Sequence, residues 1–575
     1  MPWRLPHRAA HAPRRNLMRR SLHAAHLAGW LICAIALAAP TQAAWLSLDG
    51  STSPAEPRID VVADTPSLLQ LEVAVPGMTA EERATPEGSD THVTIPGHGH
   101  TLEIGAPAIP VVNFIVEVPH GARCEVQSTA SAARSYALGT DGLQSRLYPA
   151  QPSQRKVDAR DALGDFQRDL DAYQRPGFVP EELVTLREMG IMRGHRLLLV
   201  QAHPVAYDPV AGELLAHDRI AIMIQMQGAD LAGTQAELRR THSPVFETLL
   251  ARHVVNHGSF LGGPREFPLL PIGLLIVSAP GLEGAVAPLA DWKTQKGYHT
   301  TLVTTDETGS SVGQIEDYIA NAYNNWEIPP TWVLLVGDTD TIPYRVGSSS
   351  SSATDLYYTT ITGGDFLPEL HVGRLAGRTT TEIGAMVEKA VSSERMELTN
   401  GTDFMNTATW IASSDMGAFA EGTHNYCIEH WFDPAGINSI RIYERLGGST
   451  QDIRDAINGG TLMANYSGHG STNMWNCVPF TQTDIRNLTN NDMYPLIISN
   501  ACLTGDYASS ECYGETWVRV ADKGGVAHFG ASTYSYWDED DILEKELWRH
   551  FWEEDDYTIG QMCDGGLLGV YEYYA

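Results

Sequence analysis

The residues best suited to chemistry lie in two blocks in the last third of the chain. The first block reads TLMANYSGHG and ends in His469 and Gly470, and the second reads YPLIISNACLTG and contains Cys502. A thiol is only a few per cent ionised near neutral pH, so it needs a neighbouring imidazole to supply the thiolate or to move its proton. The pair predicts a nucleophile, Cys502, with His469 as its base. The backbone N–H groups of Gly470 and Cys502 are suited to an oxyanion hole, because the glycines beside His469 let the backbone approach a substrate closely.

Three other interpretations of these blocks stay open. A buried cysteine after a strand is commonly a small hydrophobic residue, and a histidine between glycines is commonly part of a turn. The third interpretation is a zinc site with the ligands His469, Cys477, Cys502 and Cys512. The spacing of those four residues fits no metal-ligand pattern that we can justify.

The two blocks need a scaffold that brings their ends together. Each block is an apolar strand that ends at its reactive residue, and catalytic groups gather at the carboxyl ends of strands in a parallel α/β sheet. From residue 272 onward, apolar strand-like runs alternate with segments of helical periodicity, which predicts a mostly parallel sheet flanked by helices. The expected strands are 272–277, 300–304, 332–336 and 408–412, and the expected helices are 285–296, 315–326 and 382–398.

The first half of the chain has a different pattern. Strand-like runs such as 109–118 and 220–226 are separated by turn residues, so this half is expected to be β-rich. The polar segment 153–187 between them is expected to be a loop or a surface helix. A Gly-Gly-Pro joint at 262–264 is followed by Arg265, and exposed joints of this kind are typical of domain boundaries and proteolytic nicks.

The N-terminal 43 residues have the pattern of a secretory signal peptide. Arginines precede an apolar run at 27–39, which small residues around Ala43 follow. The run is shorter than the roughly 20 residues that span a bilayer, so we expect cleavage after Ala43; an uncleaved anchor is the alternative. No later segment is apolar enough to span a membrane, and the six later cysteines form no C-x-x-C pair. A protein that is secreted or located at the cell surface is therefore expected.

Length and charge limit the function classes. At roughly 150 residues per domain, 575 residues predict three or four domains. The chain has 70 acidic and 39 basic residues, a formal net charge of -31. A nucleic-acid binder needs a basic surface that releases phosphate counterions, so nucleic acid is excluded as an expected partner.

Further segments accompany the two blocks and carry a resemblance. The second half contains DWKTQKG at 291–297, VLLVGD at 333–338, VGR at 372–374, CYGE at 512–515 and ASTYSYW at 531–537; the first half contains GAPAIP at 105–110 and MRGH at 192–195. The second half resembles the gingipain family of cysteine endopeptidases, members of the caspase-like clan, and the first half resembles that family's inhibitory propeptide. The resemblance implies a signal peptide (1–43), a β-rich prodomain (44–265) and caspase-like peptidase subdomains A (266–400) and B (401–575).

The resemblance also implies catalytic roles. Cys502 corresponds to the nucleophile that forms a thioester acyl-enzyme, and His469 corresponds to the acid/base that protonates the leaving amine before water hydrolyses the thioester. The family places a glutamate against the histidine's other nitrogen, and the matching residue here is Asp415, which is one methylene shorter. A carboxylate there would fix the tautomer and stabilise the imidazolium; an ordinary helix N-cap is the alternative role for Asp415.

A calcium site is implied in the same way. Hard cations prefer oxygen ligands. The residues that match family ligands are the carboxylates of Asp338, Asp365 and Glu369 and the backbone carbonyls of Thr362 and Leu367. Solvated loop acids are the alternative. A second family calcium site is expected to be degraded, because Phe419 stands where an acid is needed.

Substrate preference is implied by two further matches. Trp537 matches a lid over the primary specificity pocket, and Glu421 falls at the place of the pocket acid of arginine-cleaving members. A carboxylate that pairs with a guanidinium would favour arginine, and Arg265 would then be a propeptide cleavage site. The acidic runs 538–541 and 553–556 are expected to be solvated faces without a role.

These observations together predict a secreted zymogen. It would cleave peptide bonds in proteins or peptides without an organic cofactor, and its own prodomain would inhibit it. A sortase-like processing peptidase of a bacterial secretion system and a catalytically silent surface or binding protein on the same fold are the alternatives. Compared with the family, the chain is expected to be incomplete at its C-terminus, where a last strand and an immunoglobulin-like domain commonly follow.

Overall fold

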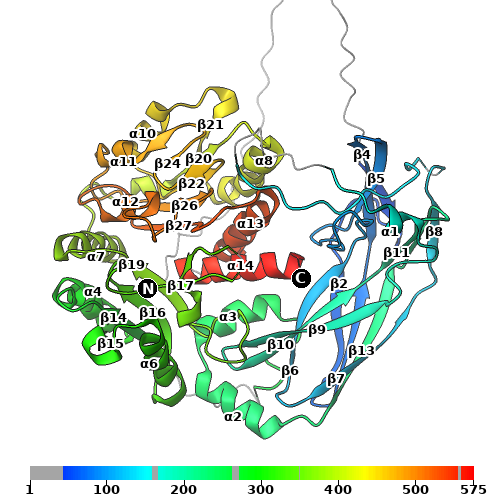
Figure 1. Cartoon of the computed structure of the whole chain (residues 1–575), viewed down its shortest axis with the longest axis horizontal. Helices are drawn as coiled ribbons and strands as arrows, with labels where there is room; N and C mark the ends of the chain where they lie inside the picture. The colour runs from blue at the N-terminus through cyan, green and yellow to red at the C-terminus, as the bar shows by residue number, and fades with distance from the viewer. Residues whose placement is uncertain are drawn as a thin grey trace, which may run out of the picture.

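A β-rich region and an α/β region lie side by side in the computed structural model (Figure 1). The structure describes residues 43–140, 142–157, 166–261, 271–348, 350–553 and 558–574. The β-rich region comprises the described residues up to 261, and the α/β region comprises those from 271 onward. Residues 1–42 of the predicted signal peptide (1–43) lie outside the described residues. The predicted cleavage site, Arg265, lies outside them as well.

Antiparallel sheets build this region, which the sequence predicts to be β-rich. One sheet has four strands in the order β2-β3-β13-β7, and three sheets have three strands each, in the orders β6-β10-β9, β1-β4-β5 and β11-β12-β8. Side chains of β3 and β13 alternate between buried and more exposed positions, which is the pattern of strands with one face on a core. The strands are β1 (Ala44–Ser47), β2 (Arg58–Thr65), β3 (Leu68–Ala74), β4 (Gly77–Thr85), β5 (Gly88–Thr94), β6 (Val112–Val118), β7 (Arg123–Ala130), β8 (Arg134–Ala137), β9 (Val184–Met192), β10 (His195–Ala202), β11 (Val205–Asp208), β12 (Glu213–Ala216) and β13 (Arg219–Gln227). The helices are α1 (Leu170–Gln174), α2 (Leu231–Thr241) and α3 (Pro244–His253).

The first sheet of the α/β region has the order β15-β14-β16-β19, and all its strands are parallel. β14 is buried along its whole length, as expected of a central strand covered on both faces. Capping boxes begin α6 and α7. The strands are β14 (Gly273–Ser278), β15 (His299–Thr304), β16 (Pro330–Val336) and β19 (His371–Leu375), and the helices are α4 (Glu283–Gln295), α5 (Thr305–Thr308), α6 (Val312–Asn325) and α7 (Thr380–Arg395). The predicted alternation of strands and helices is confirmed here.

The second sheet has the order β21-β20-β22-β26-β27 and is also parallel throughout. Its central strands β20, β22 and β26 are almost completely buried. The strands are β20 (Thr407–Ala412), β21 (Asn438–Tyr443), β22 (Met463–Ser467), β26 (Leu496–Asn500) and β27 (Ala527–Gly530). The helices are α8 (Gly417–Cys427), α10 (Thr450–Gly459), α11 (Gln482–Arg486), α12 (Tyr513–Arg519), α13 (Trp537–Glu553) and α14 (Ile559–Tyr574). The two sheets lie on either side of residue 400, where the sequence places the subdomain boundary.

The C-terminal helices connect the regions. α13 packs against α8 and α14, and α14 also contacts α3, β6 and β19. In Figure 1 this red helix lies between the two parallel sheets and the β-rich region. The last described helix, α14, therefore contacts the first sheet and the β-rich region as well as subdomain B. The sequence pattern did not indicate these contacts.

Two further observations concern membranes and cysteines. None of the helices in the described part of the chain combines the length and the apolar character that a membrane span needs. Within the same part, all the cysteines are free thiols: Cys124, Cys427, Cys477, Cys502, Cys512 and Cys563.

Candidate active site

His469 and Cys502 follow two neighbouring strands of the second sheet. β22 pairs in parallel with β26, and Ser467 stands directly opposite Asn500 in this register. His469 lies two residues beyond Ser467, and Cys502 lies two residues beyond Asn500. The carboxyl ends of adjacent parallel strands therefore carry both residues, as the sequence predicts.

The thiol of Cys502 is covered in this structure. Only 2% of the residue is exposed. The sulfur donates a hydrogen bond to the backbone carbonyl of Lys156 at 2.9 Å and accepts one from the backbone N–H of Ser535 at 3.4 Å. Burial raises the pKa of this thiol, which favours its neutral form. The next residue, Leu503, has a φ of 60°, a left-handed conformation that is uncommon for leucine and concentrates at functional sites.

His469 lies between Asp415 and Trp537. Its Nε2 is 2.9 Å from Asp415 Oδ2, and its ring meets the Trp537 ring edge-on with centroids 5.5 Å apart. The other nitrogen, Nδ1, is buried and has no hydrogen-bond partner among the described residues. The aspartate thus reaches the histidine although its side chain is short, and the N-cap of α8 is Met416 rather than Asp415. This arrangement leaves Nδ1 to exchange a proton with a reacting group.

The backbone at Gly470 passes close to that of the Cys502 block. A Cβ atom at Gly470 would lie 2.8 Å from the Cβ of Ala501 and 3.0 Å from the carbonyl oxygen of Cys502. A side chain cannot fit at this distance, so the position requires glycine. The predicted oxyanion hole needs such a close approach of the two backbones, and the direction of its donors toward a substrate stays a prediction.

A segment of the β-rich region covers the site. Residues 154–156, here called the plug segment, run antiparallel to the stretch before α13. Lys156 donates its backbone N–H to the carbonyl of Ser535 at 2.9 Å, and the carbonyl of Gln154 accepts from the N–H of Trp537 at 3.0 Å. Binding of an extended segment through main-chain hydrogen bonds is a common mode of peptide recognition. The plug segment therefore binds as a peptide ligand would.

The side chain of Lys156 fills a pocket beside the thiol. Its Nζ lies 3.2 Å from Ser467 Oγ, 2.8 Å from the carbonyl oxygen of Asn500 and 2.8 Å from Asp540 Oδ2. The face of Trp537 lies 4.7 Å from the same nitrogen. An ammonium has three N–H donors, and this pocket offers three oxygen acceptors and an aromatic face. The pocket is complementary to a lysine side chain in charge and in the number of its acceptors.

The carbonyl group of Lys156 meets the thiol through its oxygen. This oxygen lies 2.9 Å from the sulfur of Cys502 and accepts its hydrogen bond. Acyl transfer needs the sulfur at the carbonyl carbon while the oxygen lies among oxyanion-hole donors. The segment thus occupies the site in the manner of a substrate, with the thiol held as a hydrogen-bond donor.

The structure separates the two residues expected in the specificity pocket. Trp537 forms a wall of the pocket around Lys156, where a lid residue was expected. Glu421 does not meet the Lys156 ammonium; its Oε1 is 3.0 Å from Nε of Arg445. The expectation for Glu421 came from the family resemblance alone, and the structure pairs this carboxylate with Arg445 instead. The carboxylate that the structure places there is Asp540.

Sequence reasoning missed both Asp540 and the plug segment. Asp540 belongs to the run 538–541, which was expected to be a solvated face, yet the residue is only 8% exposed. A signal for it exists, because all the buried residues of α13 except His550 share one face at helical spacing: Trp537, Asp540, Glu544, Leu547 and Trp548. The plug segment lies in 153–187, which was expected to be only a loop or surface helix, and its polar sequence gives no sign of its binding site.

Part of the predicted calcium set gathers in the loop before β19. Glu369 Oε2 accepts from the backbone N–H groups of Ile361 and Thr362 at 2.6 and 3.3 Å, and Asp365 Oδ1 accepts from that of Leu367 at 2.8 Å. Glu369 Oε1 is buried without a hydrogen-bond partner, and burial raises the pKa of this carboxyl to about 8. An orphaned carboxylate oxygen with a second carboxylate nearby fits a hard cation.

Asp338 does not belong to this group, which corrects its expected role. Its Oδ2 lies 2.7 Å from Nε of Arg378 and 2.8 Å from Nη2 of Arg519. Two guanidinium groups already neutralise the carboxylate, so it acts as an ion-pair partner rather than as a cation ligand. The local sequence could not show this, because both arginines lie far along the chain.

The β-rich region also contacts the loop that contains Asp365. Asp365 Oδ2 accepts from the backbone N–H of Ile191 at 2.9 Å. The neighbouring Gly190 has a φ of 137°, and a Cβ atom there would lie 2.0 Å from the same carboxylate oxygen. Arg193 is buried and donates to the carbonyl of Glu369 at 3.0 Å. The two regions are therefore joined at a second place, away from Cys502.

The zinc alternative is not supported as it was stated. Asp415, His469 and Cys477 place possible ligand atoms within 4.8 Å of one another. Cys502 is not in this group and contacts the plug segment instead, and Cys512 is the N-cap of α12.

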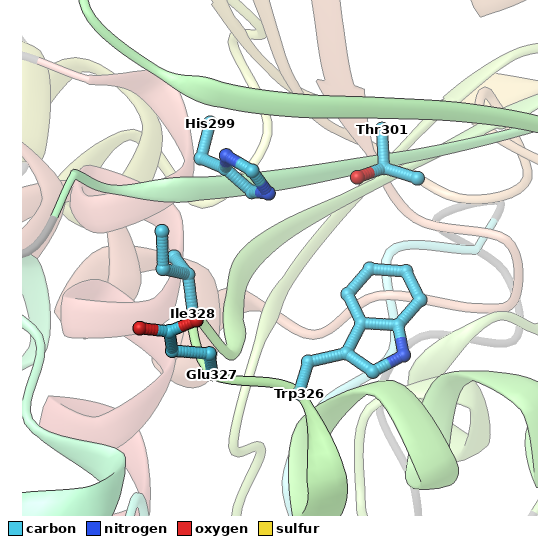
Figure 2. Close-up of a pocket in the computed structure, with 5 residues that line it drawn as sticks. All are labelled: His299, Thr301, Trp326, Glu327 and Ile328. Atoms are coloured by element: carbon cyan, nitrogen blue, oxygen red, sulfur yellow. The ribbon is translucent and has the colours of Figure 1, made fainter.

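A surface pocket outside the site is shown in Figure 2. Its lining residues are His299, Thr301, Trp326, Glu327 and Ile328. They lie on β15 and in the chain after α6, at the edge of the first sheet. None of the predicted site residues is among them.

Family models match both regions of the chain. Peptidase family C25 matches residues 268–572, and Propeptide_C25 matches residues 52–240. The chain belongs to peptidase family C25. Its β-rich region is called the prodomain below, and its α/β region the peptidase domain.

Individual relatives and solved structures support the same assignment. Lys-gingipain of Porphyromonas gingivalis is 32% identical over 471 residues, which cover 79% of this chain and 27% of that protein. Gingipain R2 of the same species is 27% identical over 361 residues, 61% of this chain and 48% of the relative. The chain thus spans less than half the length of either relative.

Two solved structures share the fold. The crystal structure of the Arg specific cysteine proteinase gingipain R aligns with a TM-score of 0.50 at 26% identity, covering 54% of this chain and 75% of that chain. The complex of Porphyromonas gingivalis RgpB pro- and mature domains aligns with a TM-score of 0.50 at 25% identity, covering 52% and 74%. The predicted fold class, a mostly parallel α/β peptidase preceded by a β-rich prodomain, is confirmed.

Proposed function

We propose that this chain is the zymogen of a cysteine endopeptidase that cleaves after lysine. The observation that carries the proposal is the Lys156 side chain in the pocket beside Cys502, with its ammonium on three oxygen acceptors. Membership of peptidase family C25 supports the reaction class. One relative is named Lys-gingipain, and a solved neighbour is described as Arg specific. These names point to different residues before the scissile bond, so the pocket of this chain decides between lysine and arginine.

The proposed reaction uses the residues at the ends of β22 and β26. His469 takes the thiol proton as the sulfur of Cys502 attacks the substrate carbonyl carbon, and the carbonyl oxygen gains negative charge near the N–H groups of Gly470 and Cys502. The C–N bond breaks as His469 gives a proton to the leaving amine, which leaves a thioester on Cys502. Water then attacks the thioester, and its proton returns to the thiol through His469. Asp415 is a positioning residue that holds the imidazole and stabilises its charged form.

The preference for lysine over arginine follows from the pocket's acceptors. The three oxygens surround one nitrogen atom, which suits the compact charge of an ammonium. A guanidinium is planar and presents five donors in a fork, for which a bidentate carboxylate is the matching partner. We therefore replace the expectation of arginine cleavage through Glu421 with lysine cleavage through Asp540.

Inhibition by the prodomain is the second part of the proposal. The plug segment fills the specificity pocket and covers the thiol, which donates a hydrogen bond to the carbonyl oxygen of the segment. Burial raises the pKa of Cys502, and the Lys156 ammonium partly offsets this rise. Activity therefore requires removal of the prodomain. We further propose export through the N-terminal segment and removal of the prodomain by a cut near Arg265, both of which depend on residues outside the described ones. A lysine preference does not account for a cut after arginine, so a second peptidase would make it.

Calcium binding is proposed for the loop before β19. Its ligands would be the carboxylates of Asp365 and Glu369 with the backbone carbonyls of Thr362 and Leu367, and without Asp338. The buried, unpartnered Oε1 of Glu369 supports this set. A bound calcium ion would neutralise two adjacent carboxylates and stabilise the loop.

Fluorogenic peptides that differ only in the residue before the scissile bond test the proposal. The processed enzyme should hydrolyse the lysine peptide at least tenfold faster, in kcat/KM, than the arginine peptide. The Cys502→Ala variant should hydrolyse neither. Hydrolysis of one particular partner protein, with no hydrolysis of the peptides, would favour the sortase-like alternative. Absence of any Cys502-dependent activity after prodomain removal would favour the silent binding protein.

A further inference from the structure

A cluster of histidines and glutamates lies inside the prodomain, apart from the active site. His195 begins β10, Glu117 lies on β6 and Glu247 lies on α3, while His242 and His257 lie on either side of α3. His195 is 2% exposed, and the side chains of Glu247 and His257 are each 15% exposed. The sequence gives no hint of the cluster, because its members come from separate elements.

The nitrogen and oxygen atoms of this cluster converge on a small volume. Ligand atoms of His195, Glu247 and His257 all lie within 4.8 Å of one another. His195 Nε2 is 3.4 Å from Glu247 Oε1, and His257 Nε2 is 3.0 Å from Glu247 Oε2. A tetrahedral zinc ion with bonds of about 2.0–2.1 Å holds its ligands about 3.3 Å apart. The two distances from a histidine nitrogen to a Glu247 oxygen are close to this value, and the two histidines lie within reach of the same ion.

Hydrogen bonds to neighbouring residues also fix the orientation of the two histidine rings. Nδ1 of His195 is 3.0 Å from Oε1 of the buried Glu117, which fixes the tautomer and turns Nε2 toward Glu247. A histidine that binds a metal through one ring nitrogen commonly donates the N–H of its other ring nitrogen to a carboxylate. Asn256 exchanges two hydrogen bonds with the backbone of Glu117, at 2.8 and 3.0 Å, and so positions the adjacent His257.

Hydrogen bonding alone leaves the cluster incompletely satisfied. Glu247 Oε2 and His257 Nε2 are both buried and close together, yet neither has a well-aligned hydrogen-bond partner among the described residues. Glu117 Oε2 is a further buried oxygen without a partner. Burying polar atoms without hydrogen-bond partners costs folding free energy, and a cation bound between these atoms would remove that cost.

We propose that the prodomain binds one divalent cation of the zinc class through His195, Glu247 and His257, with the carboxylate of Glu117 holding the His195 ring in place. Imidazole and carboxylate ligands suit zinc, and three protein ligands leave a fourth position for water or for the nearby His242, whose Nδ1 is 3.1 Å from Glu247 Oε1.

The site is placed to brace the interface between prodomain and peptidase domain. The cation would tie α3 and the chain after it to β10. α3 in turn packs on the peptidase domain, where Phe246 stacks on His371 with ring centroids 4.4 Å apart and Ser243 lies 3.0 Å from Thr331 Oγ1. The proposal does not depend on the peptidase chemistry or on the lysine preference.

The test uses the full chain with Cys502→Ala, stripped of metal and reloaded with zinc or cobalt. We expect one ion per chain by elemental analysis. His257→Gln and Glu247→Gln should each lose stoichiometric binding, and Glu117→Gln should weaken the affinity about 10- to 100-fold. His469→Gln is the matched control, because His469 belongs to the other group of described residues that could hold a metal; His217→Gln is a second control on a prodomain histidine outside the cluster.

A spectroscopic measurement covers the case in which a variant fails to fold. Cobalt bound to the chain without ligand substitutions should show tetrahedral visible bands and no thiolate charge-transfer band, since the cluster has no sulfur whereas the group around His469 includes Cys477. Failure to bind one equivalent, a thiolate band, or loss of binding in His469→Gln but not in His257→Gln would each overturn the proposal.

Discussion

Replacing Asp540 by asparagine removes the charge that meets the lysine ammonium and keeps the size of the side chain. The ion pair with Lys156 is well buried, with side-chain exposures of 0% for the lysine and 11% for the aspartate. Removing one charge of a buried ion pair leaves the other charge uncompensated and costs about 3–5 kcal/mol. Asparagine retains one oxygen acceptor, so we expect about 2–4 kcal/mol, which is a loss of about 30- to 900-fold in kcat/KM for a lysine peptide.

The assay compares two peptides that differ only before the scissile bond, one with lysine and one with the neutral analogue norleucine. Asp540→Asn should lower kcat/KM for the lysine peptide only, because norleucine has no charge to pair. Asp541→Asn is the matched control: it lies next along α13 but pairs with Lys545 at 2.8 Å, so it should change either value less than about threefold. Equal losses for both peptides, or a lysine-specific loss in Glu421→Gln, would refute the assignment of the pocket.

Other expected outcomes concern the catalytic pair, the plug segment and the calcium loop. Asp415→Ala should lower kcat about 100-fold with little change in KM, and Asp415→Glu should retain most of it, because the carboxylate positions His469; steady-state kinetics measures both. Lys156→Ala in the uncleaved chain should speed labelling of Cys502 by a peptide-like thiol probe about 30-fold or more, since the plug segment loses its buried ion pair; an unchanged rate would mean that other contacts hold the plug segment. Alkylation of Cys502 by iodoacetamide should need a higher pH in the uncleaved chain than after prodomain removal, because burial raises the thiol pKa more than the Lys156 ammonium lowers it, and a raised pKa lowers the thiolate fraction at any given pH; rate–pH profiles of both forms test this. Calcium should raise the melting temperature by about 5 °C at saturating concentration, and Glu369→Gln, but not Asp338→Asn, should abolish the increase.

The sequence predicts much of the peptidase fold, because its signals are local. Buried strands such as β14 are continuous apolar runs, and helices such as α6 have an apolar stripe and a capping box. His469 and Cys502 were found for the same reason: each ends an apolar strand, and the register of β22 and β26 brings those ends together.

The remaining features depend on contacts between distant parts of the chain. Lys156 and Asp540 are separated by most of the sequence, so no local pattern links a polar loop to an acidic helix start. Asp338 looks like a calcium ligand until Arg378 and Arg519 are brought to it by the fold. The expected role of Glu421 follows from the family resemblance and not from a physical signal in the sequence, and the structure pairs it with Arg445.

The central claim is that Cys502 cleaves peptide bonds after a residue held as Lys156 is held in the zymogen. Its most direct test is digestion of an unfolded protein by the processed enzyme, with the new termini mapped by mass spectrometry against a Cys502→Ala control. We predict cuts after lysine that are absent from the control. Cuts that persist in the Cys502→Ala sample, or that follow arginine or other residues as often as lysine, would contradict the account.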